Sequence, residues 1–245
     1  MDTKFADGIP EEPSGPNPAW KIAMVGGPVF LALSTAWALW TWWKESEDDS
    51  IDPRLALSSA AADVAELDDT VWKLGKVLGP RGWDTRAGRA NMRRAIALID
   101  GTLSPRNYGY RTKRGGHLER ADHPWPTLWA DLAGASEPER VVVVNAAYDR
   151  SDAAVAVVLA VARDLRDEEF GPTIRFVFHP AELYLKATPV KQPSGVLARG
   201  EVLGQTLVPD LPGESEGTVS RGGWNGARLK PVADAFAQQV RESAR

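Results

Sequence analysis

The sequence predicts an α/β protein, a three-layer sandwich with a largely parallel central sheet, preceded by one N-terminal transmembrane helix. A continuous apolar run at 141–144 and a second, largely apolar run at 173–178 are typical of strands that are buried on both faces. The Ala/Val/Leu-rich segment 152–166 between them is typical of a buried helix, and this order indicates a right-handed βαβ unit. The transmembrane helix is predicted at residues 22–43, which contain no ionisable side chain.

The segment 22–43 is long enough to cross a bilayer, because a helix of this length reaches about 33 Å at about 1.5 Å per residue. Lys21 and Lys44 bracket it. A secretory signal is the rival interpretation, but the apolar stretch is longer than usual and no small-x-small cleavage site follows it. Aromatic and small residues predict contacts with headgroups or a partner helix, although a plain lipid-facing anchor is the simpler interpretation. These residues are Trp20, Trp37, Trp40, Trp42, Trp43, Ala23 and Gly27.

The chain divides into an N-terminal tail (1–21), the transmembrane helix (22–43), an acidic linker (44–56) and a water-soluble domain (57–245). The formal net charge is −4, of which the tail carries −2 and the linker −3, so the domain is left with a charge of +1. A nearly neutral domain lends no electrostatic support to nucleic-acid binding. The absence of cysteine excludes disulfides, thiolate catalysis and cysteine-ligated metals.

Apolar residues at helical spacing predict three further helices, at 57–78, 85–100 and about 228–243. Gly79 and Pro80 should end the first of these helices, since both residues interrupt helical backbone. Residues 101–139 are polar and rich in turns, and they predict one or two antiparallel strands near 108–114 and 126–132.

Three segments resemble the di-zinc exopeptidase family, which includes bacterial leucyl aminopeptidases, glutaminyl cyclases and the ectodomain of transferrin receptor. VVLAVARDL at 157–165 is similar to the helix that follows the family's metal-binding loop. TIRFVFHPAEL at 173–183 is similar to the strand that leads into its Glu-Glu pair, and LGPRGWDTRAGRANMRRAIALI at 78–99 resembles the preceding helical region. The resemblance covers residues 58–185 and implies the family's sandwich fold.

The resemblance implies a two-zinc site, but the chemistry positions differ from the family pattern. Ala147 stands in place of the histidine of the His-x-Asp motif, Leu183 replaces a metal-binding glutamate, and no histidine follows His179. Asp149 corresponds either to the motif's aspartate or to the bridging ligand, and Glu182 falls at the position of the general base. We therefore expect a degenerate member of the family, a pseudoenzyme in which Asp149 and Glu182 are vestiges of a catalytic site.

Two forms of residual chemistry stay open. Asp149, His179 and Glu182 lie at predicted strand ends and could hold a single metal ion. Asp149 and Glu182 could also act as a carboxylate pair in acid–base catalysis. A histidine directly after a strand is more often a hydrogen-bonded structural residue. We expect no bound metal and no cofactor.

A local basic patch is predicted from four residues, Arg106, Arg111, Lys113 and Arg114. Such a patch could contact anionic lipid headgroups or an acidic partner. The simpler interpretation is a solvated loop or the charged face of an edge strand.

We expect a non-catalytic, membrane-anchored accessory or scaffold subunit of a bacterial membrane protein complex, with a peptidase-like domain that makes protein–protein contacts. Its expected partners are other integral membrane proteins and the lipid bilayer, and not nucleic acid. The alternatives are a membrane-bound metallohydrolase of the aminopeptidase type with a rearranged site, and a peptide-binding receptor. A single-pass location in the inner membrane is expected. The basic residues flanking the helix are balanced, so a periplasmic domain is implied by the resemblance alone.

Overall fold

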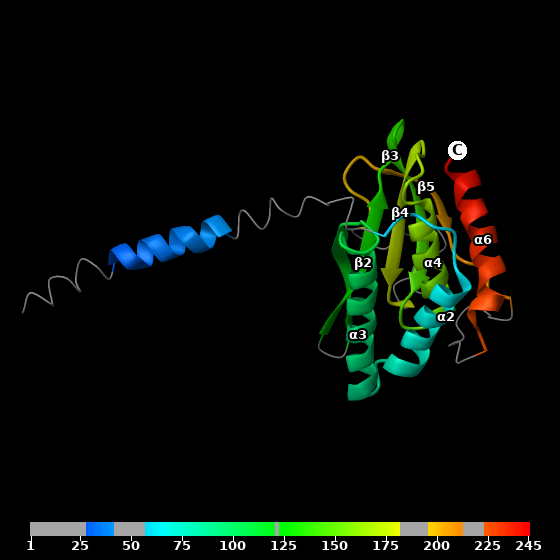
Figure 1. Ribbon diagram of the computed structural model, residues 1–245, viewed down its shortest axis with the longest axis horizontal. Helices are drawn as coiled ribbons and strands as arrows, with labels where there is room; N and C mark the ends of the chain where they lie inside the picture. Colours follow the sequence, from blue (N-terminus) through cyan, green and yellow to red (C-terminus); the bar gives the residue numbers. More distant parts are fainter. Residues whose placement is uncertain (1–27, 42–56, 121–122, 182–195, 213–222) are drawn as a thin grey trace, which may run out of the picture. The chain divides into compact units, whose positions relative to one another are not determined.

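The computed structural model describes residues 28–41, 57–120, 123–181, 196–212 and 223–245. The chain forms two compact units, Met1–Ser50 and Ile51–Arg245. The described part of the first unit is one helix, and the second unit contains a sheet with its covering helices (Figure 1).

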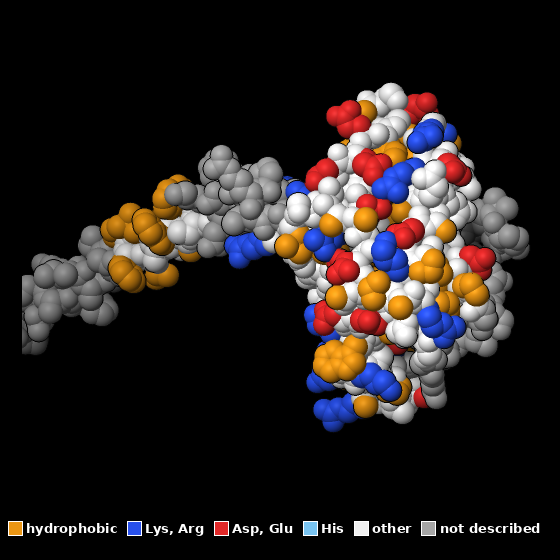
Figure 2. Space-filling model, turned by 45° about the vertical axis from the view of Figure 1, so that its right-hand side comes forward, with side chains coloured by type: hydrophobic (Ala, Val, Ile, Leu, Met, Phe, Trp, Pro, Cys, Tyr) orange, Lys and Arg blue, Asp and Glu red, His pale blue; other side chains and the backbone are white. Residues whose placement is uncertain are grey.

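The helix at residues 28–41 exposes most of its apolar side chains, as Figure 2 shows. The Trp37 and Trp40 rings lie 5.3 Å apart and have exposed fractions of 66% and 50%. No helix within the described ranges is both long enough and apolar enough to cross a membrane. The predicted span 22–43 extends past both ends of this helix, so it stays a prediction. The other predicted anchor residues lie outside the described residues: Trp20, Ala23, Gly27, Trp42 and Trp43.

The second unit is built on a five-stranded sheet with the order β1-β2-β4-β3-β5 (Figure 1). The strands are β1 (Thr112–Arg120), β2 (His123–Leu132), β3 (Glu137–Ala147), β4 (Pro172–His179) and β5 (Val202–Leu207). β3 pairs in parallel with β4 and β5, whereas β2 pairs antiparallel with β1 and β4. The sheet as a whole is therefore mixed rather than largely parallel as predicted, since two of the four strand pairings among the described residues are antiparallel. The antiparallel strands predicted near 108–114 and 126–132 correspond to β1 and β2. Their connection is too short for a parallel crossover, so they form a hairpin and the sheet is mixed.

The predicted strand–helix–strand unit is β3, α4 (Asp152–Leu165) and β4. The Ser151 hydroxyl caps α4 by accepting a hydrogen bond from the Ala154 N–H at 3.0 Å. Every residue of α4 from Ala153 to Ala162 is buried. This explains why its sequence is apolar all round rather than on one stripe.

Three other helical segments cover the domain: α2 (Val64–Trp72), which continues into the π-helix η1 (Lys73–Leu78), α3 (Arg86–Leu103) and α6 (Gly226–Ser243). The predicted end of the first helix is confirmed, because Gly79 adopts a φ of +72° directly after η1. That helix begins at Val64, later than the predicted residue 57. The helices α3 and α6 match their predicted positions within a few residues.

Alternate strand residues separate into two apolar clusters, one on each face of the sheet. Val142 and Phe176 belong to the larger cluster, which also contains the buried residues of α2, α3, α4 and α6. Val141 and Val177 point to the other face, where they pack with Val196. Within the described ranges no helix covers that second face, so the third layer of the predicted sandwich stays a prediction.

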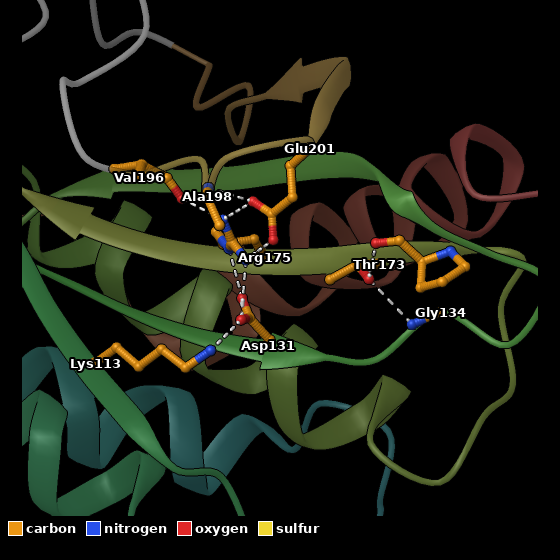
Figure 3. Close-up of polar contacts among 9 residues, drawn as sticks. Lys113, Asp131, Gly134, Thr173, Arg175, Val196, Ala198 and Glu201 are labelled. Atoms are coloured by element: carbon orange, nitrogen blue, oxygen red, sulfur yellow. Dashed lines mark hydrogen bonds and ion pairs between the residues drawn. The ribbon is translucent and has the colours of Figure 1, made fainter.

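One buried charge lies on the second face, as Figure 3 shows. Arg175 of β4 is 3% exposed, and its guanidinium pairs with Asp131 of β2 and with Glu201, just before β5. It also donates to the Val196 carbonyl oxygen, while Lys113 Nζ lies 2.9 Å from Asp131 Oδ2. This polar cluster connects β2, β4 and the segment that leads into β5.

Candidate binding cleft

A cleft of about 450 Å³ opens where β3 ends and α4 begins. Its walls come from the loop between these two elements, from α2 and η1, and from the segment before α6. Ligands bind open α/β sheets at the carboxyl ends of their parallel strands, so this cleft is the candidate functional site. The charged residues that line it are Asp68, Lys76, Arg81, Asp149, Arg150 and Asp152.

Asp149, a predicted vestigial catalytic residue, lies in this cleft and is 7% exposed. Its Oδ1 accepts a hydrogen bond from the Ala181 N–H at 2.8 Å, and burial raises the pKa of its carboxyl group. The Tyr148 N–H donates to the His179 carbonyl oxygen at 3.1 Å. Asp149 therefore helps to join the ends of β3 and β4. Glu182, the second predicted vestigial residue, lies outside the described residues, so a carboxylate pair stays a prediction.

His179 is the last residue of β4 and is 3% exposed. Its Nδ1 lies 2.9 Å from the Pro180 carbonyl oxygen, which can only accept, so this nitrogen is the donor. Burial lowers the pKa of His179 to about 4, and the ring is therefore neutral at pH 7.

The described residues do not fit a zinc centre by themselves. Among them, no group of three or more His, Cys, Asp or Glu side chains is placed to hold a metal ion. One oxygen of the Asp149 carboxylate already accepts a hydrogen bond from a backbone N–H. A single-metal site would also need Glu182, which lies outside the described residues, so that site stays a prediction.

An ion pair between Arg81 and Asp152 forms part of the cleft wall. The two side chains are 5% and 16% exposed, and Arg81 Nη1 also donates to the Leu74 carbonyl oxygen at 2.7 Å. Gly75 permits this arrangement, since a Cβ atom there would lie 2.8 Å from Asp152 Oδ2. This pair was not predicted from the sequence. An aspartate in the first turn of a predicted helix was a usable signal, but its partner is 71 residues away.

Two tryptophans lie at the cleft together with the charged groups. Trp72 is 57% exposed, and Trp224 is half-buried with the Arg228 guanidinium 4.9 Å from its ring centroid. Asp68 accepts a hydrogen bond from the Gly226 N–H, which fixes the start of α6 against α2. Aromatic residues and arginine are enriched at protein–protein interfaces, and the cleft presents both.

The predicted basic patch is exposed at all four positions, Arg106, Arg111, Lys113 and Arg114. Arg111 and Lys113 line a second hollow of about 380 Å³. Lys113 and Arg114 lie on the edge strand β1 and form ion pairs with Asp131 and Asp100. These two residues match the edge-strand interpretation, whereas contact with lipid or an acidic partner stays a prediction.

No family model matches the sequence, and no curated protein sequence matches it. Among solved structures, Porphyromonas gingivalis glutaminyl cyclase is 16% identical with a TM-score of 0.39, and the match covers 60% of each chain. Bacteroides thetaiotaomicron glutaminyl cyclase is 10% identical (TM-score 0.44), with 76% of this chain and 99% of that chain covered. A leucine aminopeptidase precursor from the same organism is 13% identical (TM-score 0.37), with 60% and 63% covered. This chain thus spans about three fifths of the first and third of these structures. Identities and TM-scores this low do not assign it to a family.

Proposed function

We propose that this chain is a non-catalytic, membrane-anchored accessory or scaffold subunit of a bacterial membrane protein complex. Its domain binds partner proteins, and the cleft beside α4 is the contact site. The anchor lies in the inner membrane and the domain lies on the periplasmic side. Other integral membrane proteins and the bilayer are its partners.

One observation carries the non-catalytic part of the proposal: the polar side chains nearest the strand ends already hold the domain together. Asp149 accepts the Ala181 N–H, and Asp152 forms an ion pair with the buried Arg81. Carboxylates engaged in this way are poorly placed to activate a water molecule or to bind a metal ion.

Membrane anchoring is supported by the helix at residues 28–41. Its apolar side chains are exposed on several sides, with exposed fractions of 74% for Phe30, 66% for Leu33 and 66% for Trp37. A helix that is apolar all round needs lipid or other protein around it. The predicted span 22–43 supplies enough length for lipid to be that surrounding.

A peptide-binding receptor is the second candidate, and the cleft itself favours it. A volume of about 450 Å³ suits a short peptide segment, and Trp72 offers an apolar ring at the cleft. The lining holds three acidic and three basic side chains. A peptide with both charge signs would therefore be favoured over a strongly charged one.

The test is purification of the full-length, tagged chain from its own membranes in a mild detergent, followed by mass spectrometry and measurement of stoichiometry. Fixed ratios to other membrane proteins are expected. Trp72→Ala should lose the partners, and Lys230→Ala on α6 is the matched surface control. Recovery as a lone monomer would contradict the scaffold role. Bound zinc with an aminopeptidase activity that Glu182→Gln abolishes would contradict the non-catalytic role.

A further inference from the structure

The two edges of the sheet differ in how they are protected. β1 and β5 are the end strands of the sheet order, so in the described part of the chain each pairs with a neighbour on one side only. An edge strand presents backbone N–H and C=O groups that another strand can bind, and proteins usually guard such edges with charge or proline.

Within the described residues the two edges differ in charge: β1 carries charged side chains and β5 carries none. β1 has the sequence TKRGGHLER and carries four charged residues. From Val202 to Val208 the β5 edge reads VLGQTLV and carries none. Val202 and Val208, at the two ends of this stretch, are 62% and 55% exposed.

The charged residue just before β5 is turned away from the edge. Both oxygens of Glu201 bind the buried guanidinium of Arg175, at 2.7 and 3.0 Å, and its side chain is only 20% exposed. Leu203 pairs with Val141 and Gln205 with the next residue of β3, so one extra residue forms a bulge between them. The exposed residues Gln205 and Thr206 follow that bulge.

We propose that β5 pairs edge to edge with β5 of a second copy of this chain. A two-fold axis makes such a pair antiparallel and uses the same edge on both copies. An uncharged strand can lie opposite its own copy without the repulsion that like charges would cause. The stretch 202–208 is centred on Gln205. An antiparallel pair that covers it therefore places Gln205 opposite its own copy and Val202 opposite Val208.

The absence of cysteine from the chain makes a clean test possible. Gln205→Cys is introduced into the full-length chain in mild detergent and treated with a mild oxidant. A disulfide-linked dimer is expected, because residues opposite each other in an antiparallel pair have neighbouring Cβ atoms. Ala235→Cys, at an exposed position on α6, is the control and should stay monomeric. Since the cross-link reports on β5 alone, association through the membrane helix does not produce it.

Charge variants on the Gln205→Cys background test the register. Val202→Lys with Val208→Lys puts like charges opposite each other and should abolish the cross-link. Val202→Lys with Val208→Glu puts opposite charges together and should restore it. Equal cross-linking at Gln205→Cys and Ala235→Cys, or no dimer from a variant with wild-type circular dichroism, would overturn the proposal. A cross-link from Gln205→Cys to a different protein would overturn the choice of a second copy as the partner.

Discussion

Replacing Arg175 by methionine should destabilise the domain strongly. Methionine keeps an unbranched side chain but removes the five hydrogen bonds that Arg175 donates to Asp131, Glu201 and the Val196 carbonyl oxygen. Removal of one partner of a buried ion pair costs about 3–5 kcal/mol. The Asp131 and Glu201 side chains keep exposed fractions of 17% and 20%, so water can solvate them in part. We therefore expect a loss at the lower end, about 3 kcal/mol.

Urea unfolding of a fragment that starts at residue 51, followed by tryptophan fluorescence, measures this change. Asp131→Asn and Glu201→Gln are the controls. Each leaves Arg175 with one carboxylate and should cost about 1–2 kcal/mol. If the free energy of unfolding of Arg175→Met lies within about 1 kcal/mol of wild type, or above it, the Arg175 ion pairs do not stabilise the domain and the reasoning is refuted.

The same cluster predicts a pH dependence. The Arg175 guanidinium holds the pKa of the Glu201 carboxyl below its usual 4.5. Because the pKa of Glu201 is lower in the folded than in the unfolded protein, the ionised carboxylate stabilises the folded state. This stabilisation is complete well above pH 4.5, the unfolded pKa, and is lost as the pH falls below it. Arg175→Met should lack this contribution. Its stability relative to wild type should therefore improve as the pH falls from 4.5 towards 3.

Three further predictions concern the cleft and the helical layer. Burial lowers the pKa of His179 from 6.5 to about 4, so the unfolded protein binds a proton more readily than the folded protein between these pH values. The free energy of unfolding of wild type should therefore fall by about 3 kcal/mol as the pH falls across that range. His179→Gln should show a smaller fall, and urea midpoints at several pH values compare the two proteins. Gly226→Ala should lower the free energy of unfolding by about 2 kcal/mol, because its Cβ would meet the Val64 carbonyl oxygen at 1.9 Å. Gly101→Ala has open space around its Cβ and should stabilise α3 by about 0.5–1 kcal/mol in the same assay. Trp72→Ala should change stability by less than about 0.5 kcal/mol but weaken partner binding by about 2 kcal/mol, measured by calorimetry with the identified partner. If Trp72→Ala lowered the free energy of unfolding as much as the binding free energy, the Trp72 ring would act in the core and not at a contact site.

The central unit of the fold was predictable because its signals are local. The helix predicted at 152–166 is observed at Asp152–Leu165, and both flanking strands appear where the apolar runs lie. The edge strand β5 gives no such signal. β5 was missed because VLGQTL has no alternation, contains a glycine and buries only its last residue. The change from α2 to the π-helix η1 was also missed, since both kinds of helix share one apolar stripe.

The polar interactions were less predictable because their partners are distant in sequence. Arg175 interrupts the apolar run at 173–178, and only Asp131 and Glu201, 44 and 26 residues away, explain it. Asp149 was correctly predicted to lie at the end of β3, but the resemblance did not reveal that its carboxylate binds the backbone of Ala181. Sequence pattern placed Asp149 near the strand ends, whereas the cleft and the charge pairs within it required the three-dimensional arrangement.

The burial of α4 on all sides has a consequence for synthesis of the protein in the cell. α4 contacts both α2, which precedes it in the chain, and α6, which spans Gly226–Ser243. While the ribosome still holds residues 226–243, the apolar side of α4 that α6 later covers remains open to solvent. Folding of the core can therefore finish only after α6 has left the ribosome. A stop codon before residue 226 should yield an aggregating product that cellular proteases remove.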